Sequence, residues 1–164
     1  WAGFGYQVID REAVPAASSG TLLVGDDTVL SVNTSTLLNP NYAVAGVFTA
    51  TASGTAATGY CRLRGYSTSG NAKMVIWNGT TGAVIAVSNS VAITTTAKLY
   101  EFTFSGGSIT ASTKYAIGYV ADIYTLSTDD TTNHVVYNSN SYASPTSITA
   151  DTGPIGFPEI YVKD

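Results

Sequence analysis

Apolar and polar positions alternate along most of this chain, and a helical period is nearly absent. The clearest case is residues 98–104, where Tyr100, Phe102 and Phe104 share one face that we expect to line the core. Only residues 10–17 could begin a helix, and Pro15 interrupts them. The same alternation predicts strands at 5–9, 21–24, 29–32, 43–51, 58–66, 72–78, 83–93, 98–104, 114–124, 134–137 and 158–162.

Turn-forming residues separate these segments, for example at 53–54, 68–71, 78–79, 105–107 and 128–130. Roughly ten short antiparallel strands at such spacing are typical of two packed sheets. We therefore predict an all-β fold, a jelly-roll-like antiparallel β-sandwich. Residues 21–164 form its single domain, and residues 1–20 form an N-terminal strand and linker that a neighbouring subunit could receive in exchange.

Three strands give firmer expectations. Residues 114–124 are apolar or small on both faces, which predicts a central strand. Cys61, the only cysteine, alternates with Leu63, and Trp77 shares a face with Val75, so we expect all four to be buried. The predicted core consists of Phe48, Leu63, Ile76, Tyr100, Phe102, Phe104, Ile117 and Tyr119.

Charge is scarce, and this excludes some classes of partner. Only 11% of the 164 residues are charged, the net charge is −4, and the seven basic residues are scattered. Nucleic-acid binding requires clustered Lys and Arg, so we expect none. No apolar run approaches the length needed to insert into a membrane. The place of the missing charged residues is taken by Thr, Ser, Gly, Ala and Tyr. This composition favours a protein that is extracellular or that packs against copies of itself.

The N-terminal segment has the pattern of a donated strand. Phe4, Tyr6 and Val8 share one face, and Gly3, Gly5, Gln7 and Ile9 share the other. Charged residues at 10–12 then end the strand, and 13–20 read as a small-residue linker. Such a strand can pair with the sheet edge of a neighbour or complete its own sheet, and both alternatives stay open. The chain begins with Trp1 rather than Met, as expected for a processed or excised chain.

Three segments together resemble a known group of modules. They are residues 70–89 (GNAKMVIWNGTTGAVIAVSN), 99–104 (LYEFTF) and 109–119 (ITASTKYAIGY), and residues 157–162 (FPEIYV) resemble the last strand of the same modules. The pattern is similar to jelly-roll modules of phage tail and fibre proteins and of secreted bacterial surface proteins, over residues 43–163. The resemblance implies either a structural part of a surface assembly or a glycan-recognition module.

Catalytic constellations are lacking in the sequence. His134 is the only histidine, and no Gly-x-Ser-x-Gly elbow accompanies it. One histidine and one cysteine cannot supply a usual zinc ligand set. The carboxylates, including Glu101 and Glu159, show no pair placed across a groove as glycoside hydrolysis requires. We therefore expect no enzyme activity and no cofactor.

Two weaker signals concern ions and modification. Asp129 and Asp130 are candidate calcium ligands, although Asp-rich turns are also ordinary loop formers. Asn33 and Asn78 each begin an Asn-x-Thr/Ser triplet of the N-glycosylation type, which also arises by chance in a Thr-rich chain. Asn78-Gly79 is in addition a favourable hairpin turn.

The irregular segment from 124 to 154 combines flat rings with short polar groups. Tyr124, Tyr137 and Tyr142 lie near Asn138 and Asn140, a mixture that suits carbohydrate. Tyrosine also packs well on sheet faces, so a structural role is the alternative.

The leading hypothesis is a structural subunit or module of an extracellular assembly, such as a fibre, a pilus-like filament or a virion appendage. A carbohydrate- or receptor-binding module is the alternative. The expected partners are copies of the chain or other subunits, and in the alternative a cell-surface glycan.

Overall fold

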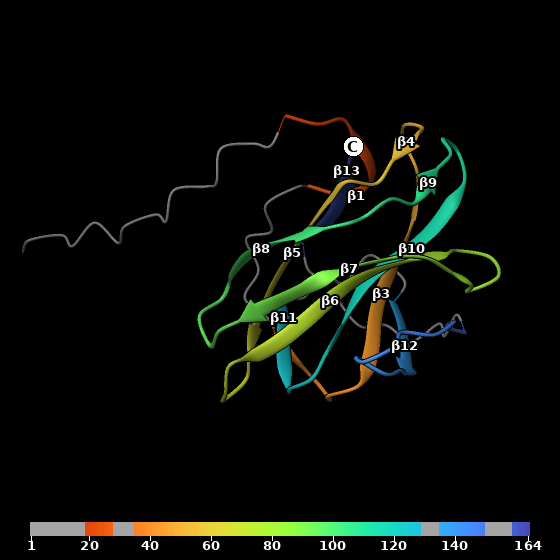
Figure 1. Cartoon of the computed structure of the whole chain (residues 1–164). Helices are drawn as coiled ribbons and strands as arrows, with labels where there is room; N and C mark the ends of the chain where they lie inside the picture. The colour runs from red at the N-terminus through yellow and green to blue at the C-terminus, as the bar shows by residue number, and fades with distance from the viewer. Residues whose placement is uncertain (1–18, 28–34, 129–134, 150–158) are drawn as a thin grey trace, which may run out of the picture.

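The computed structural model describes residues 19–27, 35–128, 135–149 and 159–164. Within these ranges there is no helix, and the chain folds into two main antiparallel sheets that pack face to face (Figure 1). The described residues hold no helix long and apolar enough to cross a bilayer. The expected arm residues Phe4, Tyr6 and Val8, the calcium candidates Asp129 and Asp130, and the sequon residue Asn33 lie outside the described residues.

The five-stranded sheet has the order β12-β3-β10-β6-β7. Its strands are β3 (Tyr42–Thr49), β6 (Gly70–Asn78), β7 (Val84–Ile93), β10 (Lys114–Ala121) and β12 (Val135–Ser139). β10 lies at the centre, as its two apolar faces predict, and its Tyr119 is opposite Val44 on one side and Met74 on the other.

The six-stranded sheet is built around β5 (Thr58–Gly65). One edge of β5 pairs with β8 (Lys98–Thr103). Along the other edge, β13 (Ile160–Lys163) pairs with the first half of β5 and β11 (Thr125–Thr128) with the second half. β13 continues to β1 (Leu22–Asp26), and β11 continues to β2 (Ser35–Leu38). The sheet therefore has a seam between Cys61, opposite Ile160, and Leu63, opposite Ser127. The short strands β4 (Gly54–Thr55) and β9 (Ser108–Ile109) pair separately.

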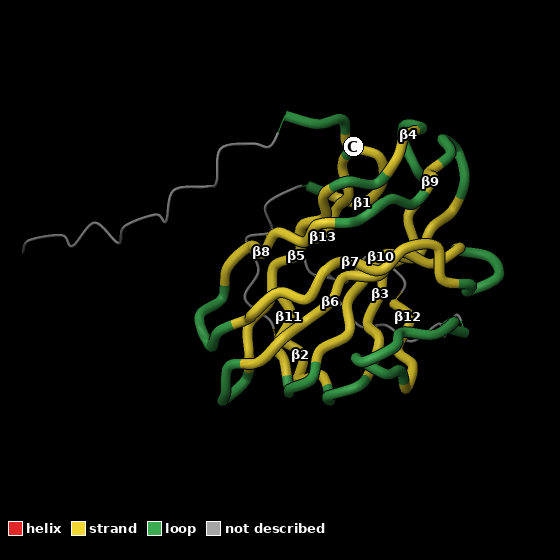
Figure 2. The backbone as a smooth tube through the Cα atoms, in the orientation of Figure 1, coloured by secondary structure: helices red, strands yellow, loops and turns green. Residues whose placement is uncertain are grey.

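The two sheets are joined directly along one side of the sandwich. There, β7 of one sheet meets β8 of the other through a bridge between Ser88 and Phe104, and the Thr103 N–H donates to Oδ1 of Asn89 at 2.8 Å. On the other side, β1, β2 and β12 end the strand orders of the described part (Figure 2). The chain passes repeatedly from one sheet to the other, which fits the expected jelly-roll-like sandwich.

The main core lies between the sheets and confirms the predicted one. Seven of the eight predicted residues are buried, and Phe48 is half-buried against the same cluster. Cys61 is fully buried, as expected, and this burial raises the pKa of its thiol well above the ordinary value, with Glu159 adding to the effect.

A second apolar layer covers the outer face of the five-stranded sheet. Trp77, predicted to be buried, belongs to this layer with Val75, Ala116, Val120 and Ile148. The cover is the segment 140–149, called the strap below. The Trp77 indole N–H donates to the Thr146 carbonyl at 2.9 Å, and the Ile148 N–H donates to the Gly82 carbonyl at 3.0 Å. The sheet thus buries both faces, which explains why its central strand has no polar side.

Gly82 is the point where the strap meets the β6–β7 turn. Its φ of 71° is in the left-handed region that favours glycine. A Cβ at this position would collide with the Ile148 carbonyl oxygen. The close approach of the strap therefore depends on the absence of a side chain.

The predicted strand 114–124 is wrong at its end, because β10 stops at Ala121 and β11 begins at Thr125 in the other sheet. The Asp122 carboxylate accepts the backbone N–H of Asn71 at 2.7 Å and its side-chain Nδ2–H at 3.0 Å. These bonds fix a turn between the sheets that periodicity does not reveal. The short strands β2, β4, β9 and β11 were likewise not predicted as separate elements.

Candidate functional site

Two of the predicted glycan residues have structural roles in the strap. Asn140 is buried and exchanges two hydrogen bonds with the backbone of Thr146, at 3.1 and 2.9 Å. The Tyr142 hydroxyl bonds to the Ser90 hydroxyl, and the Lys73 ammonium lies 4.8 Å from the centre of the Tyr142 ring. The Asn140 side chain thus braces the strap internally, and the Tyr142 side chain joins it to the sheet.

Two further predicted residues, Tyr137 and Asn138, belong to β12. They lie opposite Val44 and Ala43 of β3, and their side chains fall outside the described part of the chain. Tyr124 is in the turn before β11 and is 49% exposed. No hydrogen bond or ring contact joins Tyr124 to Tyr142, so the structure does not unite the predicted tyrosines in one site.

The structure instead pairs Tyr124 with Tyr66, a residue that was not predicted. The Tyr66 N–H donates to the Tyr124 carbonyl at 2.9 Å, one position beyond the pairing of Gly65 with Thr125. Thr125 points inward, because its hydroxyl bonds to the buried Tyr119. Side chains alternate along a strand, so Tyr66 and Tyr124 both lie on the outer face of the six-stranded sheet. Tyr66 is 55% exposed.

Contacts of the β10–β11 turn hold this tyrosine pair in place. The β10–β11 turn is tied to β6 by the Asp122 carboxylate and by the Asp122 N–H, which donates to the Asn71 carbonyl at 3.0 Å. The Ile123 side chain packs against the main core and lies so close to Gly65 and Gly70 that a Cβ at either would crowd it. These contacts fix the turn that carries Tyr124 and so preorganise the pair.

The two phenols also differ from five other tyrosines of the described part in their hydrogen bonding. The hydroxyls of five tyrosines bond to protein groups, namely those of Tyr60, Tyr100, Tyr115, Tyr119 and Tyr142. Within the described ranges, the hydroxyls of Tyr66 and Tyr124 have no such partner. Their hydrogen-bonding capacity is left to the solvent or to a ligand.

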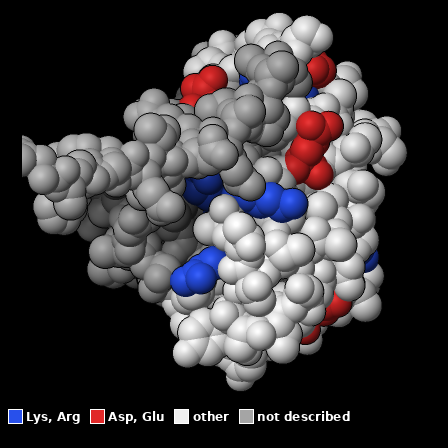
Figure 3. Space-filling model, turned by 90° about the vertical axis from the view of Figure 1, so that its left-hand side faces the viewer, with Lys and Arg blue, Asp and Glu red and all other residues white. Residues whose placement is uncertain are grey.

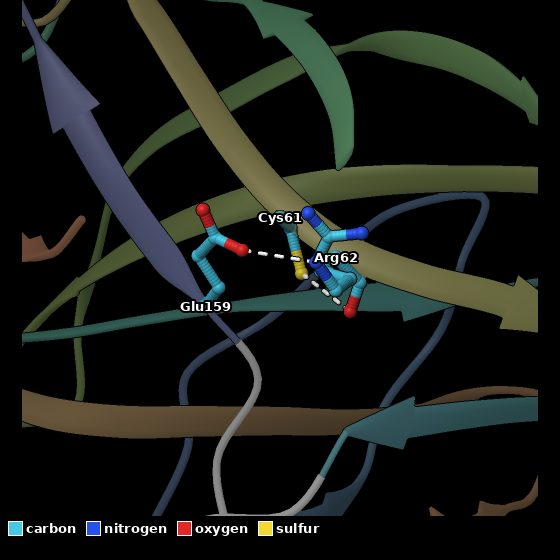
Figure 4. Close-up of polar contacts among 3 residues, drawn as sticks. All are labelled: Cys61, Arg62 and Glu159. Carbon is cyan, nitrogen blue, oxygen red and sulfur yellow. Dashed lines mark hydrogen bonds and ion pairs between the residues drawn. The ribbon is translucent and has the colours of Figure 1, made fainter. Parts of the chain in front are cut away.

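An ion pair lies on the same outer face, at the seam of the six-stranded sheet. Arg62 Nε donates to Glu159 Oε2 at 2.9 Å, and the Glu159 side chain is only 4% exposed (Figure 4). The two Nη groups of Arg62 have no partner in the described part. Figure 3, a view onto the side where β5 and β8 lie, shows basic and acidic side chains close together.

Stacked tyrosines continue this face next to the ion pair. The rings of Tyr60 and Tyr161 stack with centroids 4.8 Å apart, and the Tyr60 hydroxyl lies 3.3 Å from Glu101 Oε2. Burial, followed by the nearby Glu159 carboxylate, raises the pKa of Tyr161 to about 12. These carboxylates have structural roles, because Glu101 bonds to the Tyr60 hydroxyl and Glu159 bonds to Arg62.

A small pocket lies at the β6–β7 turn on the opposite face. It has a volume of about 150 Å³, with Val47, Ala116 and Ile148 among its apolar lining residues and Asn78 among its polar ones. Asn78 Oδ1 accepts the N–H groups of Thr80 and Thr81 at 2.9 and 2.8 Å, which confirms the expected turn. Asn78 Nδ2 has no partner within the described residues, so the modification prediction stays open to test.

The described part of the chain contains no cluster of three or more His, Cys, Asp or Glu side chains that could hold a metal. The predicted calcium ligands lie elsewhere, outside it. Tyr66 could have been found from the sequence, because Tyr60, Arg62, Arg64 and Tyr66 alternate on one face of β5. The pairing of Arg62 with Glu159 carries no sequence signal, since 97 positions separate the two residues.

The sequence has no significant match among protein-family models or curated proteins, and no solved structure matches the chain.

Proposed function

We propose that this chain is a structural module of an extracellular or virion-surface assembly, and that copies join by adding a strand to the edge of β12 that no strand of the described part pairs with. The observation that supports this is the difference between the two sides of the sandwich in the described part of the chain. β7 and β8 bridge the two sheets on one side, whereas β1, β2 and β12 are terminal strands on the other. A terminal strand with a free edge is a template for a strand from another chain.

Among the terminal strands, β12 is the best template. β1 has a register shift between Leu22 and Val24 and a φ of 110° at Gly25, and irregular edges of this kind resist pairing. β7 has two register shifts against β6. β12 pairs with β3 without interruption from Val135 to Ser139. β2 also pairs without interruption, but over four residues (Ser35–Leu38), so β12 presents the longer regular edge.

The donor in this proposal is the N-terminal strand predicted at residues 4–9. Its apolar face of Phe4, Tyr6 and Val8 spans five positions, which matches the five residues of β12. The charged residues at 10–12 would stop pairing at the end of the edge. The low charge of the chain and its resemblance to surface-assembly modules support the same function.

Deletion of residues 1–10 tests the donor. The full chain should sediment as oligomers whose size grows with concentration, because a head-to-tail contact does not close. The deletion variant should keep its β-sheet circular dichroism and sediment as a monomer. A matched control, Phe4→Asp with Tyr6→Asp, keeps the length of the chain and should also remain monomeric. A full chain that stays monomeric at high concentration would refute the proposal.

Two neighbouring proline variants test the acceptor edge. Successive N–H groups of a strand point to opposite sides, so one of Val136 and Tyr137 donates toward β3 and the other away from it. The proline that removes the outward N–H should leave the fold intact and abolish oligomers. If the folded variant of the two still assembles like the parent chain, β12 is not the acceptor.

A further inference from the structure

The outer face of the six-stranded sheet carries a second feature that strand addition does not use. Four large apolar residues of the described part are strongly exposed: Leu37, Tyr66, Val84 and Tyr124. Leu37 lies opposite Leu126, and Leu126 lies opposite Arg64, in the row next to the tyrosine pair. Three of the four therefore gather at one end of one face, rather than being scattered singly.

We propose that Tyr66 and Tyr124 form a carbohydrate-binding surface that stacks against the pyranose rings of a glycan. The negative face of an aromatic ring attracts groups with partial positive charge, and one face of a pyranose presents such C–H groups. The two rings come from the residues that directly follow β5 and precede β11, and they project from the same face, so consecutive sugar rings can lie across them. Their hydroxyls, which have no partner within the described residues, supply hydrogen bonds to the sugar.

The size of the surface favours a glycan over a protein partner. Two half-exposed tyrosines and a half-exposed leucine present on the order of 300 Å² of surface. A stable protein interface takes about 800 Å² from each partner. A patch of this area suits a ligand of two or three sugar rings, and its fixed position reduces the entropy lost on binding.

Arg64 gives this surface a means of distinguishing neutral from acidic sugars. It lies two residues before Tyr66 on the same face of β5, opposite Leu126. Its guanidinium has no partner in the described part of the chain, and a guanidinium matches a carboxylate in a two-pronged geometry. A uronate-bearing glycan would therefore gain a contact that a neutral one lacks.

A glycan array with neutral and uronate-bearing oligosaccharides tests the site on the full chain. We expect binding, and a loss of about tenfold or more in affinity for Tyr66→Ala and for Tyr124→Ala. Tyr66→Phe, which keeps the ring, should retain most of the affinity. Arg64→Gln should remove only the preference for uronates. Val84→Ala, which trims an exposed residue of the other sheet, is the matched control and should bind like the parent chain.

Two results would overturn the proposal. One is the absence of binding to the array by a chain whose circular dichroism shows that it is folded. The other is binding that both alanine variants retain in full. The variants should leave the melting temperature and the sedimentation of the chain unchanged, so failure of this site is distinguishable from failure of strand addition.

Discussion

Glu159 and Arg62 form an ion pair at the seam where β5 passes from β13 to β11. The contact between Arg62 Nε and Glu159 Oε2 is 2.9 Å long, and the Arg62 N–H donates to the Glu159 carbonyl at the same distance. The pair therefore joins the end of β13 to β5 through both side chain and backbone. Within the described residues, Arg62 is the cation paired with the buried Glu159 side chain.

Removal of Arg62 should be more costly than removal of the whole pair. Arg62→Met leaves a buried carboxylate without its partner and should lower the free energy of unfolding by about 2–4 kcal/mol. The double variant Arg62→Met with Glu159→Met should recover most of this loss, because no buried charge remains. Urea unfolding of the three proteins measures the difference. Equal losses in the single and double variants would mean that the carboxylate is adequately hydrated without Arg62.

Tyr161 should make the stability depend on alkaline pH. Its pKa rises from 10.0 to about 12 on folding, so the folded chain holds the phenol proton more tightly than the unfolded chain. Its contribution to stability is complete below pH 10 and is lost as the pH rises toward 12. The comparison is the free energy of unfolding against pH for the parent chain and for Tyr161→Phe. A difference between them that stays constant across this pH range would contradict the prediction.

Gly82→Ala should loosen the strap. A methyl group would meet the Ile148 carbonyl oxygen and would also strain the backbone at a φ of 71°, so we expect a loss of about 1–3 kcal/mol. The Ile148 N–H should lose protection from hydrogen exchange at the same time. Gly106→Ala is the control, because its φ is 141° but nothing lies within 4 Å of the added Cβ. If both variants lower the free energy of unfolding equally, the close contact between Gly82 and the strap contributes nothing to stability.

Phe102 is fully buried in the main core. Phe102→Ala should therefore cost about 3–5 kcal/mol, through lost burial and the cavity left behind. Thr103→Ala, at the exposed neighbouring position, should change stability by less than about 0.5 kcal/mol. Chemical unfolding of both variants checks the assignment of the two faces of β8.

Periodicity predicted the fold well for long strands with a clear apolar pattern on one or both faces. The three aromatic residues at 100, 102 and 104 identified the inner face of β8, and the two apolar faces of β10 identified a central strand. The apolar outer face of β10 also required a cover, but nothing in the polar segment 140–149 indicates that it supplies one. Only Ile148 and the bonds to Trp77 and Gly82 reveal that function.

The candidate site was predictable only in part. The sequence predicted Tyr124 because it is an aromatic residue in an irregular segment. Its neighbour Tyr66 lies 58 positions earlier, directly after β5. Cross-strand neighbours of this kind depend on the register between strands, which the sequence does not specify. Asn140 and Tyr142 were predicted to bind a glycan because they are an amide and an aromatic ring in a polar segment. In the structure, both side chains form hydrogen bonds that stabilise the strap.

Hydrogen exchange of the full chain at low and high concentration tests strand addition most directly. The account predicts that the backbone N–H groups of residues 4–9, and those of β12 that point away from β3, exchange freely in dilute solution. Both sets should become protected together as concentration rises, while the core strands β5 and β10 stay protected throughout. Residues 4–9 that are already protected in a dilute monomer, or a β12 whose exchange does not respond to concentration, would contradict it.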